Sequence, residues 1–191
     1  MVSKNKVYVF RHGQTYYNHN KYFTGWKDSK LTPKGIKNAE SLAKQLKDKQ
    51  IDVAFYTSLS RSKDTLNVVL KYHPECKKKL IDDRIIERDY GDLAGKKHST
   101  IIKKYGKKQF EKWHRGYSTP PPNGECFADV EKRVKDFVKY LKEFVKENKV
   151  NVAISAHGNS IRVLRKIMEG LSVKETETIE IPYDKVFVYL I

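Results

Sequence analysis

Short apolar runs alternate along this chain with longer segments in which apolar residues recur at helical spacing. We predict strands at residues 7–10, 51–56, 80–86, 150–156 and 185–191, of which the run at 80–86 is the weakest. We predict helices over residues 33–46 and 60–72, and two more that begin near residues 126 and 160. Because strands alternate with helices, the sequence predicts an α/β three-layer sandwich with a mostly parallel central sheet covered on both faces.

Local signals place several boundaries within this pattern. Thr32 followed by Pro33 is typical of a helix N-cap and first turn. Short helices are predicted between His98 and Tyr117, with a break at Gly106. The sequence Pro-Pro-Pro-Asn-Gly at 120–124 predicts an abrupt turn. The apolar face of the first long helix is predicted to be Ile36, Ala39, Leu42, Ala43 and Leu46.

Length and charge limit the classes of protein to consider. The 191 residues suit a single domain, 1–191, with a full hydrophobic core. The net charge of +16 fits nucleic acid, an acidic membrane surface or small polyanions as partners. The lysines are scattered, and no zinc-finger spacing or RNA-recognition signature is present, so we expect no nucleic-acid partner.

Other classes are excluded by what the sequence lacks. No stretch approaches about 18 apolar residues, so we expect no membrane partner, and no apolar leader precedes the first strand, which favours a cytoplasmic protein. Cys76 and Cys126 form no paired motif, so we expect no metal site. The sequence leaves the oligomeric state open, and a homo-oligomer is possible.

Two predicted strands end in similar residues. The strand at 7–10 leads into Arg11-His12-Gly13, and the strand at 150–156 leads into His157-Gly158-Asn159. Ligands bind beyond the carboxyl ends of such strands, so we expect both motifs to share one crevice. His12 is the candidate nucleophile, because an imidazole can attack when one nitrogen is held and the other is free.

The remaining chemistry fits phosphate. Arg11, Arg61 and His157 could donate to three phosphoryl oxygens, and phosphoryl transfer needs mainly positioning and charge neutralisation. Glu87, just after the strand predicted at 80–86, could be a general acid. The alternative for Glu87 is a surface carboxylate paired with Arg88, and spacing alone favours that alternative.

Three segments, 11–15, 58–62 and 156–160, resemble the histidine phosphatase superfamily. Further segments resemble the family of 2,3-bisphosphoglycerate-dependent phosphoglycerate mutases in its short bacterial form: Asn18, Phe23–Trp26, Leu31–Thr32, Glu87–Leu93, Tyr105–Gly106, Trp113, Tyr117 and Pro120–Glu125. The likeness extends over about residues 6–190. It implies a histidine phosphatase fold and interconversion of 2- and 3-phosphoglycerate.

The resemblance also implies roles for individual residues. His12 would carry the phosphoryl group, Glu87 would donate and accept the proton, and Arg11, Arg61 and His157 would hold the transferring group. The small phosphorylated substrate would be bound by Thr15, Asn18, Thr24, Gly25, Arg88, Tyr90, His98, His114, Arg115, Gly158 and Asn159. The reaction would be primed by 2,3-bisphosphoglycerate and would use no metal.

Some positions depart from the family pattern. His98 stands where the family usually has Lys, with Lys97 beside it, and His114 stands where the family has Arg. Cys126 replaces a Ser, and the sequence stops at Ile191, where relatives continue into a tail. Since imidazole is only partly charged near pH 7, we expect substrate affinity to weaken between about pH 6 and 8.

Two alternatives stay open, of which the departures favour the first and the net charge of +16 motivates the second. In the first, the protein is a phosphatase of the same superfamily, in which water takes the phosphoryl group from His12. In the second, it is a non-enzymatic module that binds polyanions.

Overall fold

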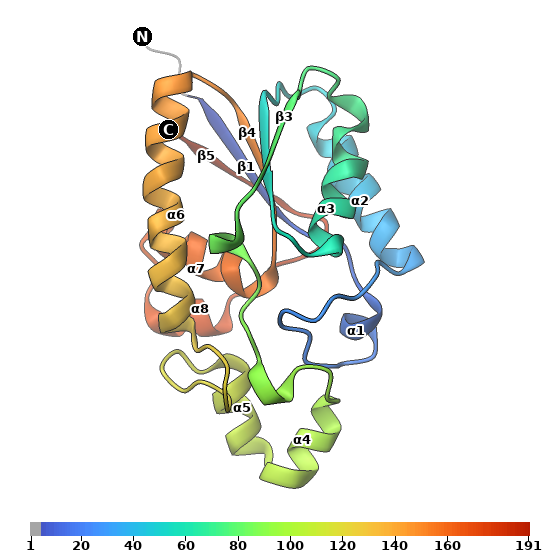
Figure 1. The fold of residues 1–191 in the computed structure, drawn as a ribbon, viewed down its shortest axis with the longest axis vertical. Helices are drawn as coiled ribbons and strands as arrows, with labels where there is room; N and C mark the ends of the chain where they lie inside the picture. The colour runs from blue at the N-terminus through green and yellow to red at the C-terminus, as the bar shows by residue number, and fades with distance from the viewer. Residues whose placement is uncertain (1–4) are drawn as a thin grey trace.

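The computed structural model describes residues 5–191 and places five strands in one sheet between two layers of helices (Figure 1). The strands are β1 (Lys6–Arg11), β2 (Val53–Tyr56), β3 (Lys78–Ile81), β4 (Val152–Ala156) and β5 (Val186–Leu190). Their order is β3-β2-β4-β1-β5, with β5 antiparallel to β1 and every other pair parallel. The prediction of a mostly parallel sheet is confirmed.

The carboxyl ends of β1 and β4 lie level with each other. Arg11 pairs with Ala156 in the parallel register, and the next backbone amide, that of His12, donates to the Ala156 carbonyl at 3.0 Å. The residues after both strands therefore emerge at the same edge of the sheet. The prediction that His12 and His157 share one crevice is confirmed, since their ring centroids are 5.0 Å apart.

Helices cover both faces of the sheet. They are α2 (Pro33–Leu46), α3 (Ser60–Val69), α6 (Phe127–Asn148) and α7 (Gly158–Glu169). Successive strand residues point to opposite faces, so Tyr8 and Phe10 pack in the core with α2 and α3. Val7 and Val9 pack with Phe137 of α6 in the core on the other face. Both alternating faces of β1 are therefore buried, as a parallel central strand requires.

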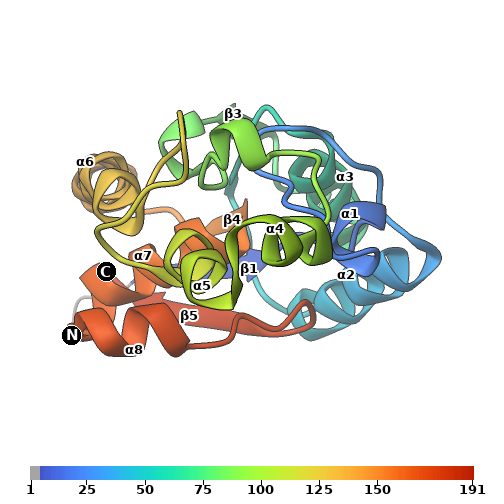
Figure 2. The same cartoon turned by 90° about the horizontal axis from the view of Figure 1, so that it is seen from below.

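Smaller elements gather at the carboxyl edge. They are α1 (Tyr16–His19), α4 (His98–Tyr105), α5 (Lys107–Arg115), α8 (Val173–Thr178) and the 3-10 turn η3 (Gly91–Leu93), whose Leu93 packs with Ile101 of α4. Two further 3-10 turns, η1 (Leu70–Tyr72) and η2 (Asp83–Ile85), lie elsewhere between the main elements. Seen from below, α4 and α5 lie across the end of the sheet near β1 and β4 (Figure 2). The break predicted at Gly106 separates them, because its φ of 80° cannot continue a helix.

Several boundaries differ from the sequence-based expectation. The strand predicted at 80–86 is wrong in its second half, because the Asp82 side chain accepts from the Arg84 amide and starts η2. The helix predicted from Ser160 begins at Gly158, directly after β4. Ile36 is 45% exposed, although the predicted cap holds, with Thr32 accepting from the Gly35 amide at 3.0 Å. The short helices α1 and α8 were not predicted.

Gly13 is needed for packing rather than for approach to a ligand. A Cβ atom at this position would lie 2.2 Å from the carbonyl oxygen of Gly35, so no other residue fits against the start of α2. The Gly13 amide donates to the Thr65 hydroxyl on α3 at 3.0 Å. Both helices on one face of the sheet thus fix the loop that carries His12.

Candidate active site

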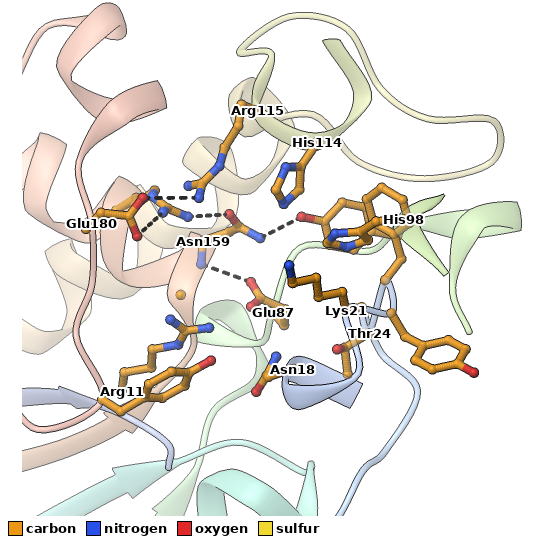
Figure 3. Close-up of a pocket in the computed structure, with 17 residues that line it drawn as sticks. Arg11, Asn18, Lys21, Thr24, Glu87, His98, His114, Arg115, Asn159 and Glu180 are labelled. Atoms are coloured by element: carbon orange, nitrogen blue, oxygen red, sulfur yellow. Dashed lines mark hydrogen bonds and ion pairs between the residues drawn. The ribbon is translucent and has the colours of Figure 1, made fainter. Parts of the chain in front are cut away.

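A cavity opens at the carboxyl edge of the sheet, bordered by the segments after β1 and β4 and by α4 and α5 (Figure 3). Most of the predicted site residues line it: Arg11, Asn18, Thr24, Gly25, Glu87, Tyr90, His98, His114, Arg115, Gly158 and Asn159. His12, Arg61 and His157 are almost completely buried, and they lie next to this cavity rather than on its open wall.

His12 has the geometry of a neutral nucleophile. Its Nδ1 lies 2.8 Å from the carbonyl oxygen of Gly13, which can only accept, so we assign the proton to Nδ1 and the free lone pair to Nε2. Burial lowers the pKa of His12 well below its usual value, and the charges of Arg61 and Arg11 lower it further. At neutral pH the imidazole is therefore uncharged, with Nε2 available for attack.

His157 lies beside His12. Its Nε2 is 2.8 Å from the Thr57 hydroxyl, and its Nδ1 is buried without a hydrogen-bond partner among residues 5–191. Burial lowers the pKa of His157 well below its usual value, with Arg61 and His12 as further causes. A neutral imidazole in this position can offer Nδ1 to an oxygen held near His12.

The guanidinium of Arg61 is fixed by backbone carbonyls. It donates to Lys27 at 2.9 Å and to Gly25 at 2.8 Å, and Asp28 lies 3.6 Å away. Burial lowers the pKa of Arg61 to about 10, so the group remains charged at neutral pH. Arg11 is fixed in a similar way, since it donates to the carbonyl of Ile181 at 3.0 Å.

Unsatisfied donors surround His12. The buried Nε atoms of Arg11 and Arg61, like Nδ1 of His157, have no partner in the part of the chain that the structure describes. Buried polar atoms are nearly always hydrogen-bonded, because leaving one without a partner costs about 1–3 kcal/mol. Acceptor oxygens of a phosphoryl group would satisfy all three, so these residues fit a phosphate beside His12.

Glu87 is buried and faces the cavity, so the alternative of a surface carboxylate is wrong. One of its oxygens, Oε1, accepts from the backbone amides of Arg88 at 2.9 Å and Asn159 at 3.1 Å (Figure 3). Oε2 makes no hydrogen bond among residues 5–191. One oxygen thus anchors the side chain, and the other is free to exchange a proton with a ligand.

Two further predicted site residues, besides His12, Arg61 and His157, do not line the cavity. Arg88 is completely buried, and its guanidinium donates to the carbonyls of Trp113 at 2.8 Å and His114 at 2.7 Å. Thr15 is also fully buried, and its hydroxyl caps α1 by accepting from the amide of Asn18. The structure corrects both expectations: Arg88 and Thr15 hold neighbouring backbone in place instead of reaching the cavity.

Sequence reasoning missed several residues of the cavity wall: Lys21, Tyr22, Phe23, Arg162, Glu180 and Tyr183. Arg162 had a usable signal, since it lies three residues after Asn159 and therefore on the same face of a helix. Glu180 had none, because the segment before β5 carries no motif.

The two unusual histidines belong to an aromatic cluster. The rings of His98 and His114 are 5.0 Å apart, and both lie against Phe23. Burial and neighbouring cations lower the pKa of His98 to about 4 and that of His114 to about 2. Both are neutral between pH 6 and 8, so the expectation that their charge changes in this range is wrong. Arg115 and the newly found Arg162 and Lys21 supply positive charge to the cavity instead.

We expect the folded state to lose stability as the pH falls below about 6.5, the ordinary pKa of histidine. His12 and His157 have lower pKa values when folded, so below that pH the unfolded chain binds protons that the native protein does not. Each such imidazole then lowers the free energy of unfolding by about 1.4 kcal/mol for every pH unit below 6.5. The full stability is present above pH 6.5.

Urea unfolding at several pH values measures this effect. The free energy of unfolding should fall less steeply with acid in a double variant His12→Asn, His157→Asn than in the wild type. Equal slopes in the two proteins would show that these imidazoles are accessible to protons in the native state.

Two classes of feature were not found in residues 5–191. No group of three or more His, Cys, Asp or Glu side chains is placed to hold a metal ion. None of the helices described combines the length and the apolar character needed to cross a membrane.

The profile of the histidine phosphatase superfamily (branch 1) matches residues 7–190. A protein of Chelativorans sp. (strain BNC1), named 2,3-bisphosphoglycerate-dependent phosphoglycerate mutase, is 38% identical over 186 residues, which cover 95% of this chain and 89% of that protein. A protein of the same name from Chlamydia abortus is 35% identical over an alignment of 211 positions, which covers 95% of this chain and 92% of that protein.

Solved structures agree on the fold. The α-ribazole phosphatase of Shigella flexneri superimposes with a TM-score of 0.81 at 22% identity, covering 96% of this chain and 89% of that one. The phosphoglycerate mutase of Bacillus anthracis gives a TM-score of 0.74 at 26% identity, covering 88% and 81%. Sequence profile, relatives and fold lead to one conclusion: the chain belongs to branch 1 of the histidine phosphatase superfamily.

Proposed function

We propose that this protein is a phosphoglycerate mutase that interconverts 2- and 3-phosphoglycerate through a phosphohistidine on His12. The observation that carries the proposal is the free Nε2 of a neutral His12 beside unsatisfied donors of Arg11, Arg61 and His157. The curated relatives named as mutases, at 35–38% identity over most of the chain, support the same substrate.

The first half-reaction follows from this geometry. Nε2 of His12 forms a bond to phosphorus while the bond from phosphorus to the ester oxygen breaks, and the leaving oxygen takes a proton from Glu87. Arg11, Arg61 and His157 donate to the three remaining phosphoryl oxygens, which neutralises their charge as the phosphoryl group moves from the ester oxygen to Nε2. In the second half-reaction these steps reverse onto the free hydroxyl of a bound phosphoglycerate, which forms the bisphosphate intermediate. Return of the other phosphoryl group of this intermediate to His12 completes the interconversion.

The cavity also suits the other end of a phosphoglycerate. Phosphoglycerate carries a carboxylate besides its phosphate, and the bisphosphate intermediate carries a second phosphate. Lys21, Arg115 and Arg162 place positive charge around the cavity. One guanidinium nitrogen of Arg115, Nη1, is buried without a partner among residues 5–191, so it can donate a hydrogen bond to such an anion.

The same two sites fit the primer, 2,3-bisphosphoglycerate. One of its phosphates would lie beside His12, and the other would lie near Arg115. Transfer of the first phosphate to His12 leaves the enzyme phosphorylated and ready for the monophosphate substrate. This role in glycolysis and gluconeogenesis would place the protein in the cytoplasm.

A phosphatase is the second candidate, and the pair His98 and His114 favours it. The family usually has cations at these two positions, whereas both imidazoles here are neutral near pH 7. A less positive cavity would hold the bisphosphate intermediate more weakly. Water would then take the phosphoryl group from His12 more often.

An assay on 3-phosphoglycerate, with and without 2,3-bisphosphoglycerate, separates these candidates. A mutase forms 2-phosphoglycerate at a rate that the primer raises, and it releases little phosphate. Free phosphate as the main product, with no effect of the primer, would establish the phosphatase instead.

We expect Arg61→Lys to slow turnover although it keeps the positive charge. Lysine lacks the planar fork that donates to Lys27 and Gly25 and also leaves Nε for the phosphoryl group. The expected loss is at least about 1–3 kcal/mol of transition-state stabilisation, the value of a charge-assisted hydrogen bond. The measurement is kcat/KM, with Lys63→Arg, an exposed change on the same helix, as the control. An unchanged kcat/KM for Arg61→Lys would place Arg61 outside the reacting site.

A further inference from the structure

Glu180 extends its carboxylate to two arginines of the cavity wall. Its Oε1 lies 3.4 Å from Nη2 of Arg115, and its Oε2 lies 3.7 Å from Nη2 of Arg162 (Figure 3). The three residues come from different elements: α5, α7 and the segment that follows α8. This contact therefore closes one side of the cavity.

Arg162 is held in place without Glu180, whereas the Arg115 side chain donates to Glu180 itself. Arg162 is 5% exposed, and it donates to the carbonyl of Ile179 at 2.7 Å and to the side-chain oxygen of Asn159 at 3.0 Å. Arg115 keeps Nη1 buried and without a partner in the described chain. The pair thus keeps donor capacity for an anion that Glu180 does not fill.

Glu180 is the exposed partner in this arrangement. Its side chain is 76% exposed, and both of its contacts are longer than a good charge-assisted hydrogen bond. Glu87, the other carboxylate of the cavity wall, is instead buried and anchored by two backbone amides. An exposed carboxylate held by long contacts is readily displaced, because such ion pairs are weak in water.

We infer that Glu180 sets the affinity of the cavity for the second anionic group of its substrate by competing with that group for Arg115 and Arg162. This inference rests on the proposed function, since it takes the substrate to be a phosphate ester with a carboxylate or a second phosphate. A ligand with a single anionic group beside His12 does not meet this competition. Glu180 thereby weakens the hold on doubly anionic ligands and favours their release.

The test is equilibrium binding to Glu180→Gln, which keeps the shape of the side chain and removes its charge. We expect the Kd for 3-phosphoglycerate, measured by calorimetry, to fall about twofold to fivefold, the range of a weak ion pair. The Kd for inorganic phosphate, which carries no second group, should stay the same. Asp184→Asn is the matched control, because it removes one exposed negative charge from the same segment.

The outcomes separate this inference from the proposed function. Tighter 3-phosphoglycerate binding in Glu180→Gln alone supports the inference, whether or not the protein then proves to be a mutase. An unchanged Kd, an equal gain in Asp184→Asn, or an equal gain for inorganic phosphate would overturn it, even if mutase activity is confirmed. If 3-phosphoglycerate binds to neither protein, the inference and the proposed function both fail.

Discussion

Replacing His12 with alanine is expected to reduce turnover by at least about 10³-fold and to abolish phosphorylation of the protein. The substitution removes the group that forms the bond to phosphorus in the proposed mechanism, and nucleophile removal in other enzymes costs this much or more. Binding should survive, because Arg11, Arg61 and His157 each keep their own anchors in the fold. A large fall in kcat with little change in substrate Kd is therefore the expected signature.

His19→Ala is a suitable control, since His19 is exposed on α1 and belongs to no part of the cavity. Its kinetics should equal those of the wild type. If His12→Ala keeps even a tenth of wild-type activity, the phosphoryl group does not pass through His12.

Glu87→Gln is expected to lower turnover of phosphoglycerate by about 10²–10⁴-fold, the usual cost of removing a general acid. Glutamine keeps an oxygen for the amides of Arg88 and Asn159, so the site should keep its shape. It cannot give a proton to the departing ester oxygen. The leaving group of a nitrophenyl phosphate needs no proton, so the turnover of this substrate should fall far less.

The ratio between the two substrates is the informative quantity. Glu111→Gln, an exposed change on α5, should alter neither rate. Equal losses on both substrates in Glu87→Gln would assign Glu87 a positioning role, with the proton coming from elsewhere.

The sequence predicted the parts of the site that follow directly from strand ends. Because β1 and β4 are parallel neighbours, the residues after Arg11 and Ala156 had to meet at one edge, and they do. The long amphipathic helices could also be predicted, since the spacing of their apolar residues indicates which face is buried. Ile36 fits that spacing but is exposed.

Side chains placed by distant packing could not be predicted. Arg88 and Arg162 are chemically alike, yet Arg88 is held by carbonyls at the end of α5, whereas Arg162 lines the cavity. Which guanidinium faces a ligand depends on contacts 17 to 26 residues away in the chain. The neutral state of His98 and His114 has a similar origin, since its largest cause is burial, and both rings lie against the distant Phe23.

The most direct test of this account is to locate the phosphoryl group on the protein. Wild-type enzyme mixed with 2,3-bisphosphoglycerate, quenched in base and digested, can be mapped by mass spectrometry. We predict an acid-labile, base-stable phosphoryl group on Nε2 of His12. When this group is introduced from labelled 2,3-bisphosphoglycerate, its label should pass to phosphoglycerate once unlabelled 3-phosphoglycerate is added. Phosphate on another residue, or turnover without any phosphorylated His12, would contradict the mechanism.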